Sequence, residues 1–220
     1  MTTQQLFDLN HTIAGEYLDR YEKPWEALSG IHEYILKLGA TLSSEKFDHP
    51  SEEIWIAKSA KIAPTASLNG ALIIDENAEI RHCAYIRGNA IVGKGVVVGN
   101  STELKNCILF DKVQVPHFNY VGDSIFGYMA HTGAGAITSN VRSDKRNIVI
   151  HDVAEIQTGL HKLVAMLGDR AEIGCNSVLN PGTIIGRDAI VYPCSCVRGI
   201  VPEQYIYKDA ENIVLREVRL

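Results

Sequence analysis

The chain has 220 residues, of which 46% are hydrophobic and 21% charged, and a formal net charge of −5 at pH 7; this size suits one well-buried domain with a small appendage. An acidic chain lacks the basic surface that a nucleic-acid partner requires, and no apolar stretch approaches the ~20 residues of a membrane span. The start, MTTQQLFDLNHT, has neither the basic nor the apolar region of a secretory signal, so we expect a cytoplasmic protein that does not bind membranes.

Residues 1–52 lack any long-period repeat and are expected to form a helical cap. Between Pro24 and Leu38 the apolar residues follow three-and-four spacing, with proline near the start and Gly39 after the end, which predicts an amphipathic helix. These apolar residues are Trp25, Leu28, Ile31, Tyr34, Ile35 and Leu38. Because repeat proteins need elements that cover the ends of the stack, we expect this segment to close the open end of the next domain.

Residues 53–220 carry a six-residue repeat of aliphatic side chains. The first run is Ile56, Ile62, Leu68, Ile74, Ile80, Ile86, Val92, Val98 and Leu104, and the second is Leu167, Ile173, Leu179, Ile185, Val191 and Val197. Small residues between them suit short strands joined by tight turns. Three such hexads make a triangular coil of about 18 residues, so the pattern predicts an all-β solenoid, a parallel β-helix of hexapeptide repeats. The tail from Pro202 to Leu220 could be strand or helix.

The repeat is interrupted at three places: a shortened step around Pro116, the polar segment Val141 to Asn147, and the segment Thr158 to Met166. Such breaks are either simple loops or places where a functional site is built. The five cysteines form no CxxC pair, which favours buried free thiols over disulfides or zinc.

Stacking the coils brings residues 18 apart to within about 4.8 Å of each other. Arg87 should therefore lie beside Lys105, and Lys105 beside Asp123, or beside Gly122 if the shortened step is counted. Two stacked cations are either a solvated ladder or a site for a phosphate or carboxylate.

His117 differs from the other histidines because it stands at a break in the repeat. Stepping 18 residues in each direction reaches Gly99 and Gly135, or Ala134 with the shortened step, so the imidazole should have open space around it. We interpret His117 as a functional residue.

The stretch from Arg87 to Asn140 resembles the acetyltransferase domain of the bifunctional N-acetylglucosamine-1-phosphate uridyltransferase/glucosamine-1-phosphate acetyltransferase. The segments that carry the resemblance are AYIRGNA, NSTELKNCIL, HFNYVGDSIFG and GAGAITSN. A family of short stand-alone chains, pyrophosphorylase-related and linked to nucleotide-sugar metabolism, is similar also in PWEAL and GCNSVLNPGT. The resemblance implies a left-handed β-helix and a homotrimer with sites between subunits.

The same resemblance implies roles for single residues. His117 falls on the catalytic base, and Asn140 on an asparagine that organises substrate and base. Substrate-binding positions fall on Arg87, Lys105, Tyr120, His131 and Arg146, with Glu103 and Ala134 as possible supporting residues. Backbone N–H groups of residues 133–136 are candidates for stabilising the oxyanion.

Three departures from the family bear on function. His131 replaces an asparagine, Val141 and Arg142 replace the residues that follow Asn140, and TGLHKLVAM replaces the region expected to contact coenzyme A. The uridyltransferase half is missing from residues 1–52, so we expect no nucleotidyl transfer.

The sequence thus predicts an acetyl-CoA-dependent N-acetyltransferase that acts on an amino-sugar phosphate resembling glucosamine 1-phosphate. A near-neutral histidine can take a proton from a sugar amine, and the chemistry requires no metal. One alternative is a non-catalytic protein that binds a sugar phosphate or nucleotide sugar. Another is a γ-type carbonic anhydrase, although the chain lacks the HxxxxH pair of that family.

Overall fold

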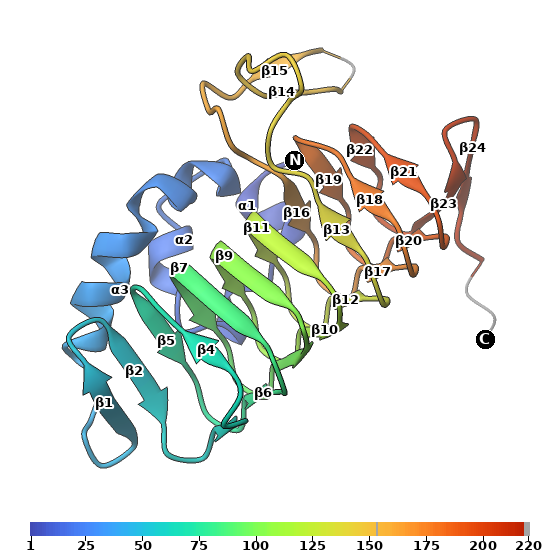
Figure 1. Cartoon of the computed structure of the whole chain (residues 1–220). Helices are drawn as coiled ribbons and strands as arrows, with labels where there is room; N and C mark the ends of the chain where they lie inside the picture. The colour runs from blue at the N-terminus through green and yellow to red at the C-terminus, as the bar shows by residue number, and fades with distance from the viewer. Residues whose placement is uncertain (153, 218–220) are drawn as a thin grey trace.

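The computed structural model describes residues 1–152 and 154–217, and it is a parallel β-helix with an N-terminal helical segment along one flank (Figure 1). The chain climbs the near face through β13, returns behind through β16, and adds coils from left to right, so the helix is left-handed. The predicted solenoid and its hand are confirmed. No helix in the described ranges is long and apolar enough to cross a membrane.

Three faces make each coil, and two of them form one continuous sheet in the described part of the chain. That sheet contains β1 (Phe47–Ser51), β2 (Ile54–Ala57), β4 (Ser67–Leu68), β5 (Leu72–Ile74), β7 (Tyr85–Val92), β9 (Glu103–Leu109), β11 (Tyr120–Phe126), β13 (Ile137–Thr138), β16 (Ala165–Leu167), β18 (Val178–Leu179), β19 (Thr183–Ile185), β21 (Cys196–Val197) and β22 (Ile200–Val201). The third face contains β3 (Lys61–Ile62), β6 (Glu79–Ile80), β8 (Val97–Asn100), β10 (Gln114–His117), β12 (His131–Thr132), β17 (Glu172–Ile173), β20 (Ile190–Val191), β23 (Tyr205–Asp209) and β24 (Asn212–Leu215).

The hexad anchors fill the core. From Ile74 onward every anchor of the two runs is buried, whereas Ile56, Ile62 and Leu68 in the first coil are half-buried. Side chains that recur at the same point of each coil stack directly on one another, which removes a continuous column of apolar surface from water. The periodic pattern therefore sets both the fold and the position of its core.

The coil shortens by one residue at one corner, and this corner is not the one around Pro116 that the sequence predicts. Arg87 pairs with Lys105, 18 residues on, whereas Ala90 pairs with Cys107, 17 residues on. The residue is lost at the corner occupied by Asn106, whose φ is 51°, and not at Pro116. The next coils keep the 17-residue step, as the pair Glu103 and Tyr120 shows.

Antiparallel strands cover both ends of the solenoid. At the N-terminal end β1 pairs with β2, so a strand from the predicted cap segment belongs to the sheet. At the other end, the tail left undecided between strand and helix forms the hairpin of β23 and β24. These strands occupy the open backbone edges that would otherwise be free to pair with another chain.

The helical segment lies along the flank rather than over the open end, which corrects the cap's expected position (Figure 1). It consists of α1 (Thr3–Leu6), the 3₁₀ helix η1 (Leu9–His11), α2 (Gly15–Leu18), the 3₁₀ helix η2 (Pro24–Gly30) and α3 (Ile31–Gly39). The single helix predicted for Pro24 to Leu38 is thus divided at Gly30. Backbone N–H groups of Asp111 and Asp169 donate to His11 and Leu6, which ties the segment to successive corners.

Two expected breaks join into one insertion. Residues 140–152 and 154–163 leave the solenoid between β13 and β16, and they carry the hairpin of β14 (Val149–Ile150) and β15 (Ile156–Gln157). Regular stacking resumes at Ala165, so the second expected break ends before Met166, which pairs with Ile125. The insertion projects above the solenoid in Figure 1.

The cysteines also differ from expectation. Cys107 alone among the five is buried, and burial raises its thiol pKa to about 12. The four exposed thiols are at or near coil corners; Cys83 and Cys194, for example, have positive φ. Side chains at the coil corners are exposed to solvent even where the neighbouring strands are apolar, and this explains the exposed thiols.

A buried carboxyl beneath the N-terminal segment gives a pH-dependent stability prediction. Asp75 is 1% exposed, and its Oδ2 has no hydrogen-bond partner in the described part of the chain. Burial raises the pKa of Asp75, partly offset by the Glu76 N–H and by Lys94. Above its folded-state pKa, ionised Asp75 destabilises the fold, and this penalty disappears as the pH falls toward the unfolded value.

We therefore expect Asp75→Asn to raise the melting temperature at pH 7 by up to a few degrees. The gain should shrink toward pH 4, where the native carboxyl takes up its proton. Asp169→Asn is the matched control. The two carboxylate oxygens of Asp169 each accept an N–H bond, from Asp8 and from Tyr128, and an amide has only one oxygen to accept them. Thermal unfolding followed at both pH values distinguishes the variants, and a pH-independent gain for Asp75→Asn would contradict the explanation.

Candidate functional site

The two cations stack as the sequence predicts. Arg87 pairs with Lys105 in the next coil, and Lys105 pairs with Gly122 in the coil after that. Gly122 rather than Asp123 continues the column because the coil has shortened by one residue. A side chain at position 122 would collide with the ring and hydroxyl of Tyr120, so the glycine lets Tyr120 pack against the column beside Lys105.

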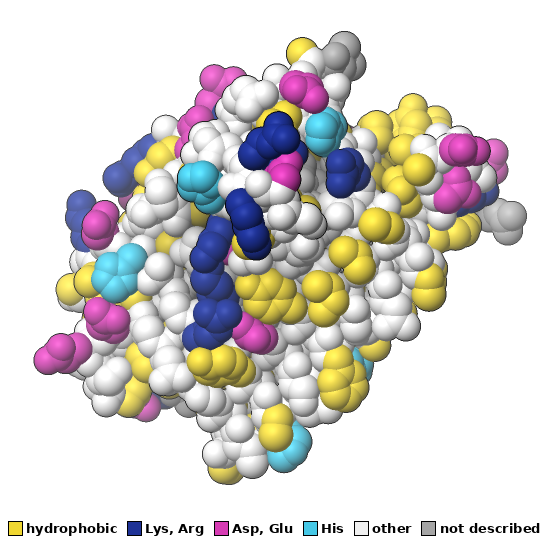
Figure 2. Space-filling view, turned by 45° about the horizontal axis from the view of Figure 1, so that its top comes forward, with side chains coloured by type: hydrophobic (Ala, Val, Ile, Leu, Met, Phe, Trp, Pro, Cys, Tyr) yellow, Lys and Arg dark blue, Asp and Glu magenta, His cyan; other side chains and the backbone are white. Residues whose placement is uncertain are grey.

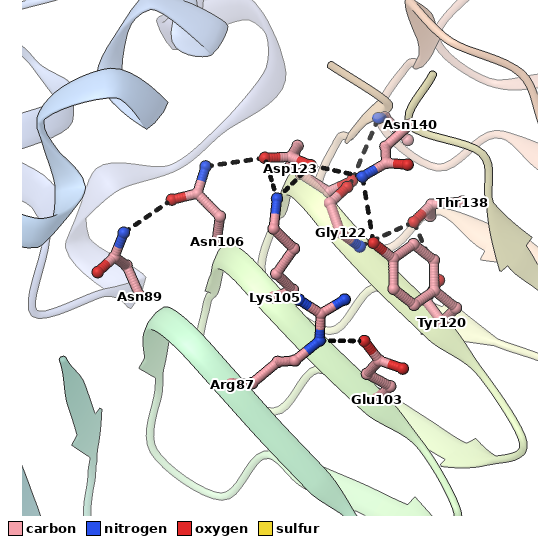
Figure 3. A network of polar contacts seen from close by, with 12 residues as sticks. Arg87, Asn89, Glu103, Lys105, Asn106, Tyr120, Gly122, Asp123, Thr138 and Asn140 are labelled. Atoms are coloured by element: carbon pink, nitrogen blue, oxygen red, sulfur yellow. Dashed lines mark hydrogen bonds and ion pairs between the residues drawn. The ribbon is translucent and has the colours of Figure 1, made fainter. Parts of the chain in front are cut away.

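Each cation has a carboxylate partner (Figure 3). Arg87 Nε donates to Glu103 Oε1 at 2.6 Å, and this bond raises the pKa of Arg87. Lys105 Nζ lies 3.1 and 3.0 Å from the two carboxylate oxygens of Asp123. The Lys105 and Asp123 side chains are only 20% and 5% exposed, so the pair is not a fully solvated ladder.

Asp123 is the hub of this network. Besides Lys105, it accepts from Asn106 Nδ2 at 3.0 Å and from Asn140 Nδ2 at 2.8 Å. Three donors offset the cost of burying a carboxylate. They also fix the head groups of Lys105 and Asn140 relative to each other.

A polar ladder runs along this corner of the solenoid. Asn89 Nδ2 donates to Asn106 Oδ1 at 3.3 Å, and Asn106 then donates to Asp123. The four residues Asn89, Asn106, Asp123 and Asn140 are each 17 positions apart. An 18-residue spacing hides this series, which is why Asn106 and the central role of Asp123 were missed; a 17-residue spacing would have found them.

Tyr120 and Asn140 complete the cluster. Asn140 Nδ2 donates to the Tyr120 hydroxyl at 3.2 Å, and Thr138 Oγ1 donates to the Tyr120 carbonyl at 2.9 Å. Burial first, and then the negative charges of Asp123 and Glu103, raise the pKa of Tyr120. The phenol is therefore a neutral hydrogen-bond donor at physiological pH.

His117 lies at the end of β10, one corner before Tyr120, and its side chain is exposed. It pairs with Asn100, not with Gly99, again because of the 17-residue step. The ring forms no hydrogen bond or ion pair with the described residues. Its backbone is well fixed: the His117 N–H donates to Asn119 Oδ1, and its carbonyl accepts from Gly135 N–H.

Asn119 connects this corner to the residue 133–136 turn. Its side chain is buried, and Nδ2 donates to the carbonyls of Gly133 at 2.8 Å and Ala136 at 3.3 Å. The turn, including half-buried Ala134, is thereby held next to His117. No motif or spacing in the sequence indicates this role of Asn119.

Two predicted residues lie outside the network. His131 on β12 forms an ion pair with Glu172, with Nδ1 2.8 Å from Oε2. Arg146 lies in the insertion with an 80% exposed side chain, 3.4 Å from Asp144 Oδ2. Within residues 1–152 and 154–217, no three His, Cys, Asp or Glu side chains are grouped as metal ligands.

Curated relatives cover most of the chain. It is 30% identical over 213 residues to the "Bifunctional protein GlmU" of Methanococcus maripaludis, a match that covers 88% of this chain and 48% of the relative. It is also 30% identical over 155 residues to a "Bifunctional sugar-1-phosphate nucleotidylyltransferase/acetyltransferase" of Sulfurisphaera tokodaii, covering 62% and 39%. The chain thus spans about half the length of the curated relatives it matches.

Among solved structures, WeeI from Acinetobacter baumannii is 15% identical with a TM-score of 0.42, covering 66% of this chain and 52% of that one. PerB from Caulobacter crescentus, in complex with CoA and GDP-perosamine, is 18% identical with a TM-score of 0.28, covering 74% and 57%. The family model of the GMPPB C-terminal domain matches residues 68–212, about two thirds of the chain. The chain belongs to the family of the GMPPB C-terminal domain.

Proposed function

We propose that this protein transfers an acetyl group from acetyl-CoA to the amine of an amino-sugar phosphate such as glucosamine 1-phosphate. The observation that carries the proposal is the stacked pair Arg87 and Lys105, held beside Tyr120 and Asn140. The GlmU relatives and the nucleotidylyltransferase/acetyltransferase of Sulfurisphaera tokodaii support it.

In the proposed complex the phosphate lies across Arg87 and Lys105. Only Arg87 Nε is occupied by Glu103, so both Nη groups remain for phosphate oxygens. Tyr120 donates its hydroxyl hydrogen to the same ligand from the next coil. Asn140, one coil further, offers Oδ1 as an acceptor, since Asp123 and Tyr120 engage both N–H bonds of its Nδ2. Glu103 and Asp123 fix the cations in place before the ligand arrives, which lowers the entropic cost of binding.

His117 is the proposed general base. It accepts the proton of the sugar amine as the amine attacks the thioester carbonyl; the tetrahedral intermediate then expels the CoA thiolate. Backbone N–H groups of residues 133–136 would stabilise the oxyanion. The turn held by Asn119 lies next to His117, as this step requires.

The proposed assembly is a homotrimer with the site between subunits. Within one chain, His117 and the cation pair lie on different faces of the solenoid. Aromatic and aliphatic side chains are exposed on both sides of that corner: Phe118 is 58%, Tyr85 40% and Ile137 37% exposed. Exposed apolar side chains of this size are typical of surfaces that contact another subunit.

Lys105→Ala tests the phosphate site. It removes one charge-assisted contact, so we expect the KM for glucosamine 1-phosphate to rise at least tenfold, about 1.5–3 kcal/mol of binding. CoA-thiol release measured against sugar-phosphate concentration gives the value. Lys61→Ala, at an exposed position on β3, is the control and should leave KM unchanged.

A non-catalytic sugar-phosphate binding protein is the second candidate. The observation in its favour is that the exposed His117 ring forms no hydrogen bond or ion pair with the network residues within the described chain. Calorimetry separates the two functions: binding of glucosamine 1-phosphate that Lys105→Ala weakens, without any thiol release from acetyl-CoA, would favour this candidate.

A further inference from the structure

A cleft lies between the insertion and the solenoid. It is at the far end of the column of stacked positions that begins with Arg87, Lys105 and Gly122. The strand pairing continues this column through Ser139, Asn180 and Arg198. Arg198 is four coils beyond Lys105, about 19 Å away at the normal strand spacing. A phosphate bound at Lys105 therefore cannot also reach Arg198.

The cleft is large enough for a small molecule. One cavity of about 250 Å³ is bounded below by Ser139, Asn180 and Arg198 and above by Arg142 and His151. A second, of about 600 Å³, shares Arg142, His151 and Arg198 and extends outward to Arg146. Together they fall in the range of ligand pockets, roughly 300–1,000 Å³.

Positive charge gathers at this cleft although the chain as a whole is acidic. Figure 2 shows the lysine and arginine side chains in a row that continues along this face to the insertion. The smaller cavity is lined by two arginines, Arg142 and Arg198, against a single carboxylate, Asp144. Arg198 is exposed and forms no hydrogen bond or ion pair within the described ranges.

The insertion already holds an anion in this way. Arg142 donates to both oxygens of Asp144 at 2.9 and 2.7 Å, and the Arg146 N–H donates to Asp144 Oδ1 at 3.1 Å. These contacts hold the pKa of Asp144 well below its ordinary range. A fork of guanidinium donors beside a backbone N–H is also the arrangement that binds phosphate oxygens.

We propose that this cleft is a second anion site, separate from the Arg87–Lys105 pair, which binds a diphosphate-bearing small molecule. Arg198 contacts one phosphoryl group from the solenoid, and the free Nη1 of Arg142 contacts the other from the insertion. Asn180 borders the site, with its Nδ2 donating to the Val197 carbonyl at 2.9 Å and its Oδ1 left to accept a hydroxyl. Two arginines on opposite walls of the cleft suit a ligand with two phosphoryl groups, one for each guanidinium.

The test is calorimetric titration of the full chain with inorganic pyrophosphate. We expect Arg198→Ala to weaken binding at least about tenfold, and Arg198→Lys, which keeps the charge but loses the fork, to weaken it less. Arg81→Ala removes a distant surface arginine paired with Glu79 and should have no effect. Because Arg198 is an exposed corner residue, thermal unfolding should show all three variants folded.

Lys105→Ala makes this test independent of the proposed acetyl transfer. Pyrophosphate binding that persists in Lys105→Ala but falls in Arg198→Ala establishes a separate site, whether or not the protein acetylates any sugar. Absence of binding to the unmodified chain at millimolar concentration overturns the proposal. Equal binding to Arg198→Ala, or equal weakening by both variants, also overturns it.

Parallel titrations with UDP and with CoA distinguish the possible sources of the diphosphate. UDP binding tighter than pyrophosphate, and lost in Arg198→Ala, assigns the cleft to nucleotides or nucleotide sugars. CoA binding with the same dependence on Arg198 assigns it to the cosubstrate. Binding of neither UDP nor CoA, alongside pyrophosphate binding, restricts the site to small free diphosphates.

Discussion

His117→Ala is expected to lower kcat for acetyl transfer by about 10²–10⁴-fold, the usual contribution of a general base. The imidazole is exposed and free of hydrogen bonds within the described chain, so its loss should not disturb the fold. KM for glucosamine 1-phosphate should change little, because the phosphate is held elsewhere, by Arg87 and Lys105. Thiol release from acetyl-CoA under saturating sugar phosphate measures the effect.

His82→Ala is the matched control for that experiment. His82 is likewise an exposed histidine near a corner, where its ring contacts Thr65 Oγ1 at 2.7 Å. It should retain full activity. A His117→Ala variant as active as His82→Ala would rule out His117 as the base.

Asp123→Ala is expected to reduce the free energy of unfolding by about 3–5 kcal/mol. Asp123 accepts hydrogen bonds from three side chains, and its loss leaves Lys105 largely buried without a counter-charge. Asp123→Asn keeps the shape but not the charge, and should destabilise less while still weakening sugar-phosphate binding. Urea unfolding followed by circular dichroism gives the free energies.

Glu79→Ala provides the comparison with a surface ion pair. Glu79 pairs with Arg81 at 3.1 Å, and both side chains are about two-fifths exposed, so the loss should stay below about 1 kcal/mol. Similar values for Asp123→Ala and Glu79→Ala would mean that the Asp123 network is not a structural centre of the site.

The sequence predicts the fold well because the six-residue repeat determines which side chains pack in the core. Anchors such as Leu104 and Leu179 are buried and pair with apolar equivalents in the next coil, Val121 and Val197, so each must be apolar to fill the core. Only the spacing of the anchors is needed to derive the solenoid. The hand of the coil does not follow from spacing, and it came from the family resemblance.

The irregular parts were harder to predict because they depend on corners and tertiary contacts. The loss of one residue at Asn106 gives the next coils a 17-residue step, which moves the neighbour of His117 from the expected Gly99 to Asn100. The flank position of the helical segment depends on backbone bonds to corners far away in sequence, such as Asp169 with Leu6. A local pattern carries no information about such contacts.

The candidate site was predicted in part. Arg87 and Lys105 lie before the change in coil length, so an 18-residue spacing places them correctly. Asp123 and Asn106 lie beyond or at that change, and only a 17-residue spacing reveals the ladder to which they belong. The cleft beneath the insertion could not be predicted, because its two walls come from Arg142 and Arg198, which are brought together by a loop of irregular length.

The central proposal is acetyl transfer to an amino-sugar phosphate, and product analysis tests it most directly. The protein is incubated with glucosamine 1-phosphate and acetyl-CoA, and the sugar phosphates are separated and identified by mass spectrometry. We predict N-acetylglucosamine 1-phosphate in amounts equal to the CoA thiol released, with the product greatly reduced for His117→Ala. Absence of the acetylated sugar, with unmodified glucosamine 1-phosphate recovered in full, would contradict the proposed function.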